Sequence, residues 1–371
     1  MPFYFPINNN FSLDEGYRSA NNLLNLRQQL RDDVPARTMN DTILVATWNL
    51  RDFDSNKFGH GPRLKESLFY IAEIISAFDV VAIQEVNKDL SGLNIVMRIL
   101  GPDWDYITTD NVEGTSGNSE RMTFVYDTRK VRFQKIAGEI VLPTNKTIGG
   151  QQFARTPFMV AFQSGWFRFN ICTVHIYYGE DRGKLLQRRI AEIDAIAAFL
   201  SKRADDEAAN YILLGDFNII SPKHQTMEAL QKHGFIIPEG LSPSNMLLDK
   251  YYDQIAFKAR DGQVKFGGHA GVFNLYKTLF TEGECTEFYP LMKNRSQLEC
   301  APDGSALDTP KNKEYYLKVW RTFQMSDHLP MWVELKIDFA DDYLRKIVTP
   351  SFDVEQTQHP LDFSMPELGN R

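Results

Sequence analysis

Short apolar runs that end in chemically active polar residues recur along the whole chain. Residues 43–48 and 80–83 are apolar runs with the length of a buried strand. Five such runs are followed by amide, carboxylate or imidazole side chains: Trp48-Asn49, Gln84-Glu85, Val174-His175, Gly215-Asp216-Phe217-Asn218 and Ser326-Asp327-His328. Because functional groups converge on the loops at one end of a packed sheet structure, the pattern predicts a site there.

Helices are expected between these strands. From Arg63 to Phe78 the apolar residues recur every three or four positions, and Pro62 stands at the start, where its missing N–H costs little. The same spacing predicts a second amphipathic helix at about 184–200. Further strands are expected at 122–126, 131–142, 157–162, 166–174, 211–214, 252–257 and 331–337, and a short helix at 224–232. The mixture indicates an α/β (α+β) protein.

The chain is interpreted as one domain with two extensions. Residues 1–40 are polar, with a helix-like piece around 23–30, and are expected to form an N-terminal extension. Residues 41–340 would form the domain, in which 260–322 is a large insertion near the predicted site. Residues 341–371 are polar and Pro-rich, which is typical of a poorly ordered C-terminal tail.

Composition excludes several classes of protein. The net charge of −7 over 371 residues argues against coating nucleic acid by bulk attraction. No apolar stretch approaches the ~18–20 residues of a membrane span, and the N-terminus lacks the pattern of a secretory signal. The three cysteines form no CxxC pair, which disfavours a thiolate zinc site. We therefore expect a cytoplasmic protein without a membrane partner, in which the basic pairs Arg129-Lys130 and Arg188-Arg189 are solvated.

The polar residues at the strand ends favour a hard divalent cation. Mg²⁺, with Mn²⁺ as the alternative, takes carboxylate and amide oxygens and keeps several waters. The imidazoles then remain free for acid–base work or charge stabilisation. A divalent ion, acids and histidines together meet the needs of in-line attack on a phosphate ester.

Seven short motifs follow one another within residues 42–338: Thr47-Trp48-Asn49, Ile83-Gln84-Glu85-Val86, Ser119-Glu120-Arg121, Thr173-Val174-His175, Leu214-Gly215-Asp216-Phe217-Asn218, Tyr252-Asp253-Gln254-Ile255 and Ser326-Asp327-His328-Leu329-Pro330. In this order they resemble the endonuclease/exonuclease/phosphatase superfamily, in its deoxyribonuclease-I-like branch. The resemblance implies a four-layer α/β/β/α sandwich, in which two mainly antiparallel sheets pack face to face with helices outside. The active site would lie at one end.

The resemblance also implies a metal site and a site for the attacking water. Glu85 matches the principal metal ligand of the family, and Asn49 matches the amide that helps to hold the metal or its waters. Asp327 matches a second ligand on the metal side. Asp216 and Asn218 match the pair that orients or deprotonates the water and holds a phosphate oxygen.

Two histidines complete the set of residues that the resemblance implies. His328 matches the catalytic histidine, with Asp253 as the carboxylate that fixes its tautomer and favours its charged form. His175 matches the second histidine of the deoxyribonuclease-like branch, with Glu120 as its orienting acid. Arg155 matches an arginine near the scissile phosphate.

These motifs indicate a reaction type rather than a substrate. The leading hypothesis is a Mg²⁺-dependent phosphodiesterase, an endonuclease that hydrolyses nucleic acid, with DNA as the first choice. The alternative is a hydrolase of a small phosphoester such as a nucleotide messenger or phospholipid head group. It is motivated by the acidic balance and by Asn87, since deoxyribonuclease I has a minor-groove arginine there. A scaffold without turnover is the third reading, and the 260–322 insertion is a candidate for substrate choice or a protein partner.

Overall fold

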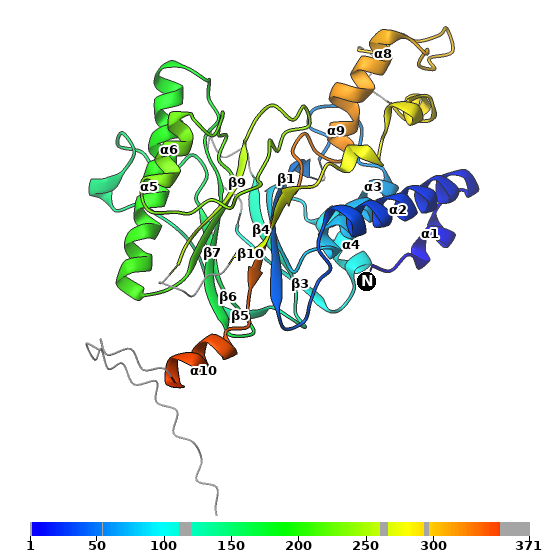
Figure 1. Cartoon of the computed structure of the whole chain (residues 1–371). Coiled ribbons are helices and arrows are strands. Elements are labelled where there is room, and N and C mark those ends of the chain that lie inside the picture. The colour runs from blue at the N-terminus through cyan, green and yellow to red at the C-terminus, as the bar shows by residue number, and fades with distance from the viewer. Residues whose placement is uncertain (1, 54, 111–119, 260–265, 293–296, 349–371) are drawn as a thin grey trace, which may run out of the picture. The chain divides into compact units, whose positions relative to one another are not determined.

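The computed structural model describes residues 2–53, 55–110, 120–259, 266–292 and 297–348 (Figure 1). The chain divides into Met1–Asp338, which holds all of the sheets, and Phe339–Arg371. In the second unit α10 (Ala340–Val348) is an amphipathic helix with Asp341 and Asp342 in its first turn. The remainder of the predicted tail, 349–371, lies outside the described residues.

Two sheets form the centre of the first unit. The six-stranded sheet has the order β10-β11-β1-β2-β4-β3, and the five-stranded sheet has the order β5-β6-β7-β8-β9. The strands of the first are β1 (Thr42–Phe53), β2 (Val80–Val86), β3 (Trp104–Thr108), β4 (Arg121–Asp127), β10 (Phe266–Val272) and β11 (Met331–Lys336). Those of the second are β5 (Arg132–Glu139), β6 (Phe158–Ser164), β7 (Phe167–His175), β8 (Tyr211–Asp216) and β9 (Asp253–Lys258).

Helices cover the outer face of each sheet (Figure 1). The six-stranded sheet carries α1 (Phe5–Asn10), α2 (Leu13–Asp33), α3 (Lys65–Ser76) and α4 (Ser91–Leu100). The five-stranded sheet carries α5 (Gly183–Glu207) and α6 (Gln225–Gln231). Short helical turns complete the unit: η1 (Thr144–Lys146), η2 (Leu275–Lys277), η3 (Glu282–Glu284), α7 (Cys285–Phe288), η4 (Tyr289–Leu291), α8 (Pro310–Tyr315), the π-helical η5 (Tyr316–Trp320) and α9 (Arg321–Gln324).

The inner faces of the sheets pack against each other through aromatic rings. Phe124 and Tyr126 on β4 contact Phe162 on β6 with ring centroids 6.1 and 5.0 Å apart. Nearer the predicted site, the buried amide of Gln84 on β2 donates to the hydroxyl of Thr173 on β7 at 2.8 Å. The layers are therefore helix, sheet, sheet, helix, and the prediction of an α/β/β/α sandwich with mainly antiparallel sheets is confirmed.

Strand direction brings the ends of seven strands to one edge of the sandwich. Each sheet contains one parallel pair, β1 with β2 and β7 with β8, so their carboxyl ends lie together. β4, β9 and β11 run antiparallel to these strands, so their first residues lie at the same edge. All of the sequence-predicted site motifs occupy these strand ends.

The predicted N-terminal extension contains α1 and α2, and α2 packs on α3. A capping box between Ser12 and Glu15 starts α2, and Leu26 is fully buried in the core of the six-stranded sheet. Arg18 forms an ion pair with the buried Glu66 of α3 at 2.9 Å. The division of the chain into extension, domain and tail nevertheless stays a prediction.

The predicted 260–322 insertion shares the core of the six-stranded sheet. Phe280 contacts Tyr70 of α3 edge-on at 6.0 Å between ring centroids, and Trp320 is 1% exposed. Residues 260–265 and 293–296 of this segment lie outside the described residues. Over the described ranges, no helix has both the length and the apolar character needed to cross a membrane.

Candidate active site

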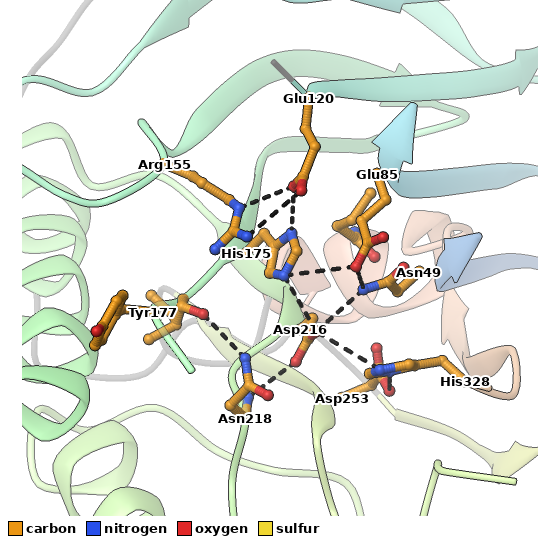
Figure 2. Close-up of polar contacts among 12 residues, drawn as sticks. Asn49, Glu85, Glu120, Arg155, His175, Tyr177, Asp216, Asn218, Asp253 and His328 are labelled. Atoms are coloured by element: carbon orange, nitrogen blue, oxygen red, sulfur yellow. Dashed lines mark hydrogen bonds and ion pairs between the residues drawn. The ribbon is translucent and has the colours of Figure 1, made fainter. Parts of the chain in front are cut away.

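Residues from both sheets meet at the shared edge (Figure 2). Asn49 is paired in register with Gln84 across the parallel strands β1 and β2. In the other sheet, Asp216 is flanked by His175 on β7 and by Asp253 on β9. Figure 2 shows the side chains of both sheets pointing toward Asp216.

Glu85 and Asn49 form the part of the site from the parallel pair of the six-stranded sheet. The Asn49 amide donates to Glu85 Oε1 at 2.9 Å and to Asp216 Oδ2 at 3.1 Å. The other oxygen of Glu85 accepts from the backbone N–H of Asp52 at 2.8 Å. Glu85 has a φ of 61°, which turns the strand end, and its side chain is 22% exposed. Solvent therefore reaches this carboxylate.

His175 has three carboxylates around it. Its Nδ1 lies 3.0 Å from Glu120 Oε2, and its Nε2 lies 3.5 Å from Asp216 Oδ2 and 3.9 Å from Glu85 Oε1. Arg155 donates from Nε to Glu120 at 2.8 Å. Burial alone would raise the pKa of Glu120, but His175 and Arg155 outweigh it and lower this pKa to about 2. Glu120 therefore stays ionised behind His175.

His328 has a matching carboxylate behind it. Its Nδ1 lies 2.8 Å from Asp253 Oδ2, and Ser244 donates its hydroxyl to the same oxygen at 2.7 Å. Burial acts to lower the pKa of His328, but the charges of Asp253 and Asp216 outweigh it and hold this pKa well above the ordinary value. The imidazole is therefore kept protonated at neutral pH.

Asp216 is the centre of the constellation. Its Oδ2 lies 3.5 Å from His175 Nε2 and 3.8 Å from His328 Nε2, and its Oδ1 accepts from the backbone N–H of Asn218 at 3.0 Å. Burial would raise the pKa of Asp216, but the two histidines, the Asn218 N–H and the Asn49 amide lower it. One ionised oxygen therefore faces two imidazoles, each supported by a second carboxylate.

Gly215 is required by the close approach of β7 and β8. It has a φ of 131°, and a Cβ at this position would lie 2.2 Å from the carbonyl oxygen of Val174. Glycine is the residue that tolerates both the backbone conformation and this contact. It therefore fixes how closely Asp216 lies to the end of β7.

The side chains of Asn218 and Arg155 are both hydrogen-bonded to other residues of the protein. The Asn218 amide donates to the carbonyl of Ile176 at 2.9 Å, and its backbone carbonyl accepts from Arg189 at 3.0 Å.

Arg189 is fully buried and Lys130 is 8% exposed, so the prediction that these basic residues are solvated is wrong. Each pairs with a carboxylate. Arg189 pairs with Asp181, which lies on a loop that folds over α5, and Lys130 pairs with Asp79 inside the fold.

Asp327 belongs to neither group of potential metal ligands, although its charge acts on the neighbouring His328. Its carboxylate is 3.4 Å from the guanidinium of Arg51, and its side chain is 43% exposed. Arg51 lies in the last part of β1, and its backbone N–H donates to Asn49 Oδ1 at 2.9 Å. The role of Asp327 as a metal ligand stays a prediction.

The donor set suits the divalent cation that the resemblance implies. Glu85, Glu120 and His175 form one group whose potential ligand atoms lie within 4.8 Å of one another, and Asp216, Asp253 and His328 form a second. Asn49 donates its amide N–H to the solvent-reached carboxylate of Glu85, and its oxygen accepts from the Arg51 N–H. Carboxylate oxygens are the ligands that a hard cation prefers, so the carboxylates around Glu85 fit Mg²⁺ or Mn²⁺.

Sequence reasoning did not identify three residues that support the site. Ser244 bonds to Asp253, Arg51 pairs with Asp327, and the ring of Tyr252 lies 5.6 Å from that of His328. Tyr252 is the first residue of the motif that contains Asp253, which is a usable signal. Ser244 and Arg51 have no comparable signal, because long-range folding alone brings them to their partners.

Comparison with known proteins gives distant structural matches. No protein-family model and no curated protein sequence matches the chain. An endonuclease/exonuclease/phosphatase family protein from Bacteroides thetaiotaomicron is 17% identical with a TM-score of 0.48, covering 80% of this chain and 98% of that one. A mannosyl-6-phosphatase from the same species is 18% identical with a TM-score of 0.47, covering 79% and 99%. TDP2 from D. rerio, complexed with a single-strand DNA product, is 12% identical with a TM-score of 0.48, covering 79% and 98%.

The fold is assigned from the architecture of the chain itself. Two face-to-face sheets bring residues of all seven motifs to one edge, including Glu120 of the third motif, whose Ser119 lies outside the described residues. The fold is thus the α/β/β/α sandwich that the resemblance to the endonuclease/exonuclease/phosphatase superfamily implies, and at the level of the fold that resemblance is confirmed.

Proposed function

We propose that the protein is a Mg²⁺-dependent phosphoester hydrolase, and that its leading substrate is a phosphodiester of nucleic acid, DNA first. One observation carries the proposal. A single oxygen of Asp216 faces the Nε2 atoms of His175 and His328 at 3.5 and 3.8 Å, and each imidazole has a carboxylate behind its Nδ1. This arrangement combines a proton acceptor with two imidazoles at a solvent-reached carboxylate, Glu85.

The proposed roles follow from charge. Asp216 is ionised and bonded to Asn49 and Asn218, so it accepts a proton from, or orients, a water that attacks phosphorus. His328 is held as an imidazolium, which stabilises charge on a non-bridging oxygen or protonates the leaving oxygen. His175, whose Nδ1 faces the ionised Glu120, directs its Nε2 at the same phosphate or at the attacking water.

The metal would be held by Glu85 and Asn49, with Asp327 as the proposed further ligand. A bound Mg²⁺ supplies Lewis-acid stabilisation of phosphate charge and a lower pKa for a coordinated water. Arg155 would act on the phosphate only through its contact with Glu120, since its guanidinium is 11% exposed and bonded to that carboxylate.

The test is Mg²⁺-dependent nicking of plasmid DNA, with and without EDTA. Asp216→Ala and His328→Ala should each lower the rate by about 10²-fold or more while leaving the protein folded, because each removes a proton-transfer group. Asp205→Asn is the matched control, since this exposed aspartate on α5 pairs with Lys258 away from the site. Unchanged activity in both variants would contradict the mechanism.

A small phosphoester is the second candidate, and the position of Asn87 favours it. This side chain is 9% exposed and donates to Asp52 at 2.8 Å and to the Phe53 carbonyl at 3.0 Å. It therefore points into the protein and is not presented to a duplex groove. A panel of plasmid, linear DNA, RNA, abasic DNA and small phosphoesters distinguishes the candidates by their relative kcat/KM. A protein inactive on all of them would instead favour the scaffold reading.

A further inference from the structure

Two tyrosines that the proposed chemistry does not use lie in contact with each other, and one of them, Tyr252, also contacts His328. Tyr178 follows His175 by three residues, and Tyr252 directly precedes Asp253. The strands β7 and β9 that carry these histidine and aspartate residues flank β8 on its two sides. The Tyr252 carbonyl accepts from the backbone N–H of Phe217 at 2.9 Å, just after Asp216. Topology therefore brings the two rings together across the end of β8.

The rings form a series of aromatic contacts that leads away from the site. The Tyr252 ring lies 5.6 Å from the His328 ring with a tilt of 30°. Tyr178 meets Tyr252 edge-on, with centroids 6.3 Å apart and an interplanar angle of 88°. Tyr178 is 48% exposed, so this surface begins at an imidazole of the site and ends in solvent.

A buried arginine fixes Tyr178 in place. The guanidinium of Arg189 lies 4.9 Å from the centre of the Tyr178 ring. Arg189 also donates to the Tyr178 carbonyl at 2.8 Å and to the Glu180 carbonyl at 3.2 Å. Because this side chain is fully buried, the loop has little freedom to withdraw. Because the exposed ring is already held in position, little conformational entropy is lost when a ligand contacts it.

The aromatic residues near Arg51 do not offer an equivalent surface. Phe323 has the guanidinium of Arg51 at 4.0 Å from its ring centroid and the ring of His60 stacked at 4.1 Å. Groups at such short distances from one centroid occupy its two faces. A flat ligand therefore finds exposed aromatic surface at Tyr178 and not at Phe323.

We propose that Tyr178 and Tyr252 form an aromatic wall, and that a nucleobase attached to the cleaved phosphoester stacks on its exposed ring, Tyr178. This inference rests on the proposed function and narrows its substrate to nucleic acid or a nucleotide. Stacking on aromatic side chains tolerates every base, because each base has a π-face. The wall would hold the base on the His328 side while the phosphate lies at Asp216.

The test compares base-containing and base-free substrates of equal charge. Tyr178→Ala should lower kcat/KM about 10-fold on a single-stranded oligodeoxynucleotide, and leave unchanged the same oligomer built from abasic residues. Tyr178→Phe should keep the wild-type value, because the ring remains. Trp166→Ala is the control, since this exposed aromatic residue lies at the opposite end of β7. A dinucleoside monophosphate shows whether one nucleotide suffices or a strand is needed.

Binding measured in parallel separates this inference from the proposed function. Fluorescence anisotropy of the labelled oligomers with Asp216→Asn, alone and combined with Tyr178→Ala, reports stacking without turnover. Weaker binding of the base-containing oligomer alone supports the wall even if the wild-type protein hydrolyses nothing, which would contradict only the hydrolase proposal. Hydrolysis that Tyr178→Ala leaves unchanged, or lowers equally with and without bases, would overturn the wall alone.

Discussion

His328 is protonated because two carboxylates face it, and each contributes from a different direction. Asp253 bonds to Nδ1 at 2.8 Å, while Asp216 lies 3.8 Å from Nε2. Burial opposes the charged form, so the two carboxylates must supply more than the cost of desolvation. The same carboxylates compete for the proton, and burial together with Asp216 raises the pKa of Asp253 despite the opposing charge of His328.

The first prediction concerns the titration of His328. Because its folded-state pKa is raised, His328 contributes stability that is fully present below about pH 6.5 and is lost as pH rises through the folded pKa. Asp253→Asn should lower the His328 pKa, since an opposite charge is removed. NMR titration of the imidazole protons measures this, with Asp205→Asn as the control. An unchanged His328 titration in Asp253→Asn would contradict the assignment.

The second prediction concerns Gly215. Gly215→Ala should lower the free energy of unfolding by about 3 kcal/mol or more, because the new Cβ meets Val174 at a φ that L-residues avoid. Hydrolysis should be lost at temperatures where the variant is still folded, since Asp216 is displaced from His175. Urea unfolding and nicking rates measure both effects. Gly138→Ala on β5 is the control, because a Cβ there meets nothing within 4 Å; an equal effect of the two substitutions would refute the argument.

The residues of the site could be predicted because their signal is local. Asn49, Glu85 and Asp216 each follow an apolar run, and that pattern survives in the sequence without knowledge of the fold. Arg189 could not be predicted correctly. It stands beside Arg188 in a charged stretch of α5, and only the loop that folds over it makes it buried.

At the scale of elements, α2 is the segment whose importance the sequence concealed. Its helix runs over Leu13–Asp33, whereas the apolar spacing indicated only about 23–30. Polar residues such as Ser19 and Asn22 are buried along it, so hydropathy alone does not reveal its inner face. Arg18 and Arg27 reach from α2 to buried glutamates of α3.

The third prediction tests this helix contact. Arg18→Ala should lower the free energy of unfolding by about 3 kcal/mol, because it leaves the carboxylate of Glu66 buried without its cation. Glu66→Gln in the same background should restore part of the loss, since a neutral amide costs less to bury. Urea unfolding of both variants measures the effect. Arg31→Ala, an exposed change on the same helix, should have little effect; a loss as large as that of Arg18→Ala would refute the ion-pair explanation.

The sequence also concealed how the predicted insertion packs. Its sequence indicated a large excursion, but Phe280 and Trp320 belong to the core around α3. Removing 260–322 would therefore unfold the protein and could not test substrate choice. Substitution of the exposed Leu307, which is 42% exposed, is a better probe of a partner or substrate surface.

At the scale of the whole molecule, a net charge of −7 makes cation binding a source of stability. The fourth prediction is that Mg²⁺ raises the Tm of the wild-type protein and that EDTA reverses this, since a ligand of the folded state stabilises by about 2.7 kcal/mol at 100 times its Kd. Glu85→Gln should abolish both this shift and hydrolysis. Glu180→Gln, whose side chain is 61% exposed, is the control measured by the same thermal scan. An equal Mg²⁺ shift in Glu85→Gln would place the metal elsewhere.

Both imidazole–carboxylate pairs cross the boundary between the sheets. His175 on the five-stranded sheet is supported by Glu120 from the start of β4, and His328 before β11 is supported by Asp253 on β9. Neither sheet alone carries a complete histidine–carboxylate pair. In a chimera that exchanged residues 132–258 for a foreign layer, the rate of hydrolysis would therefore report whether the two sheets are correctly aligned.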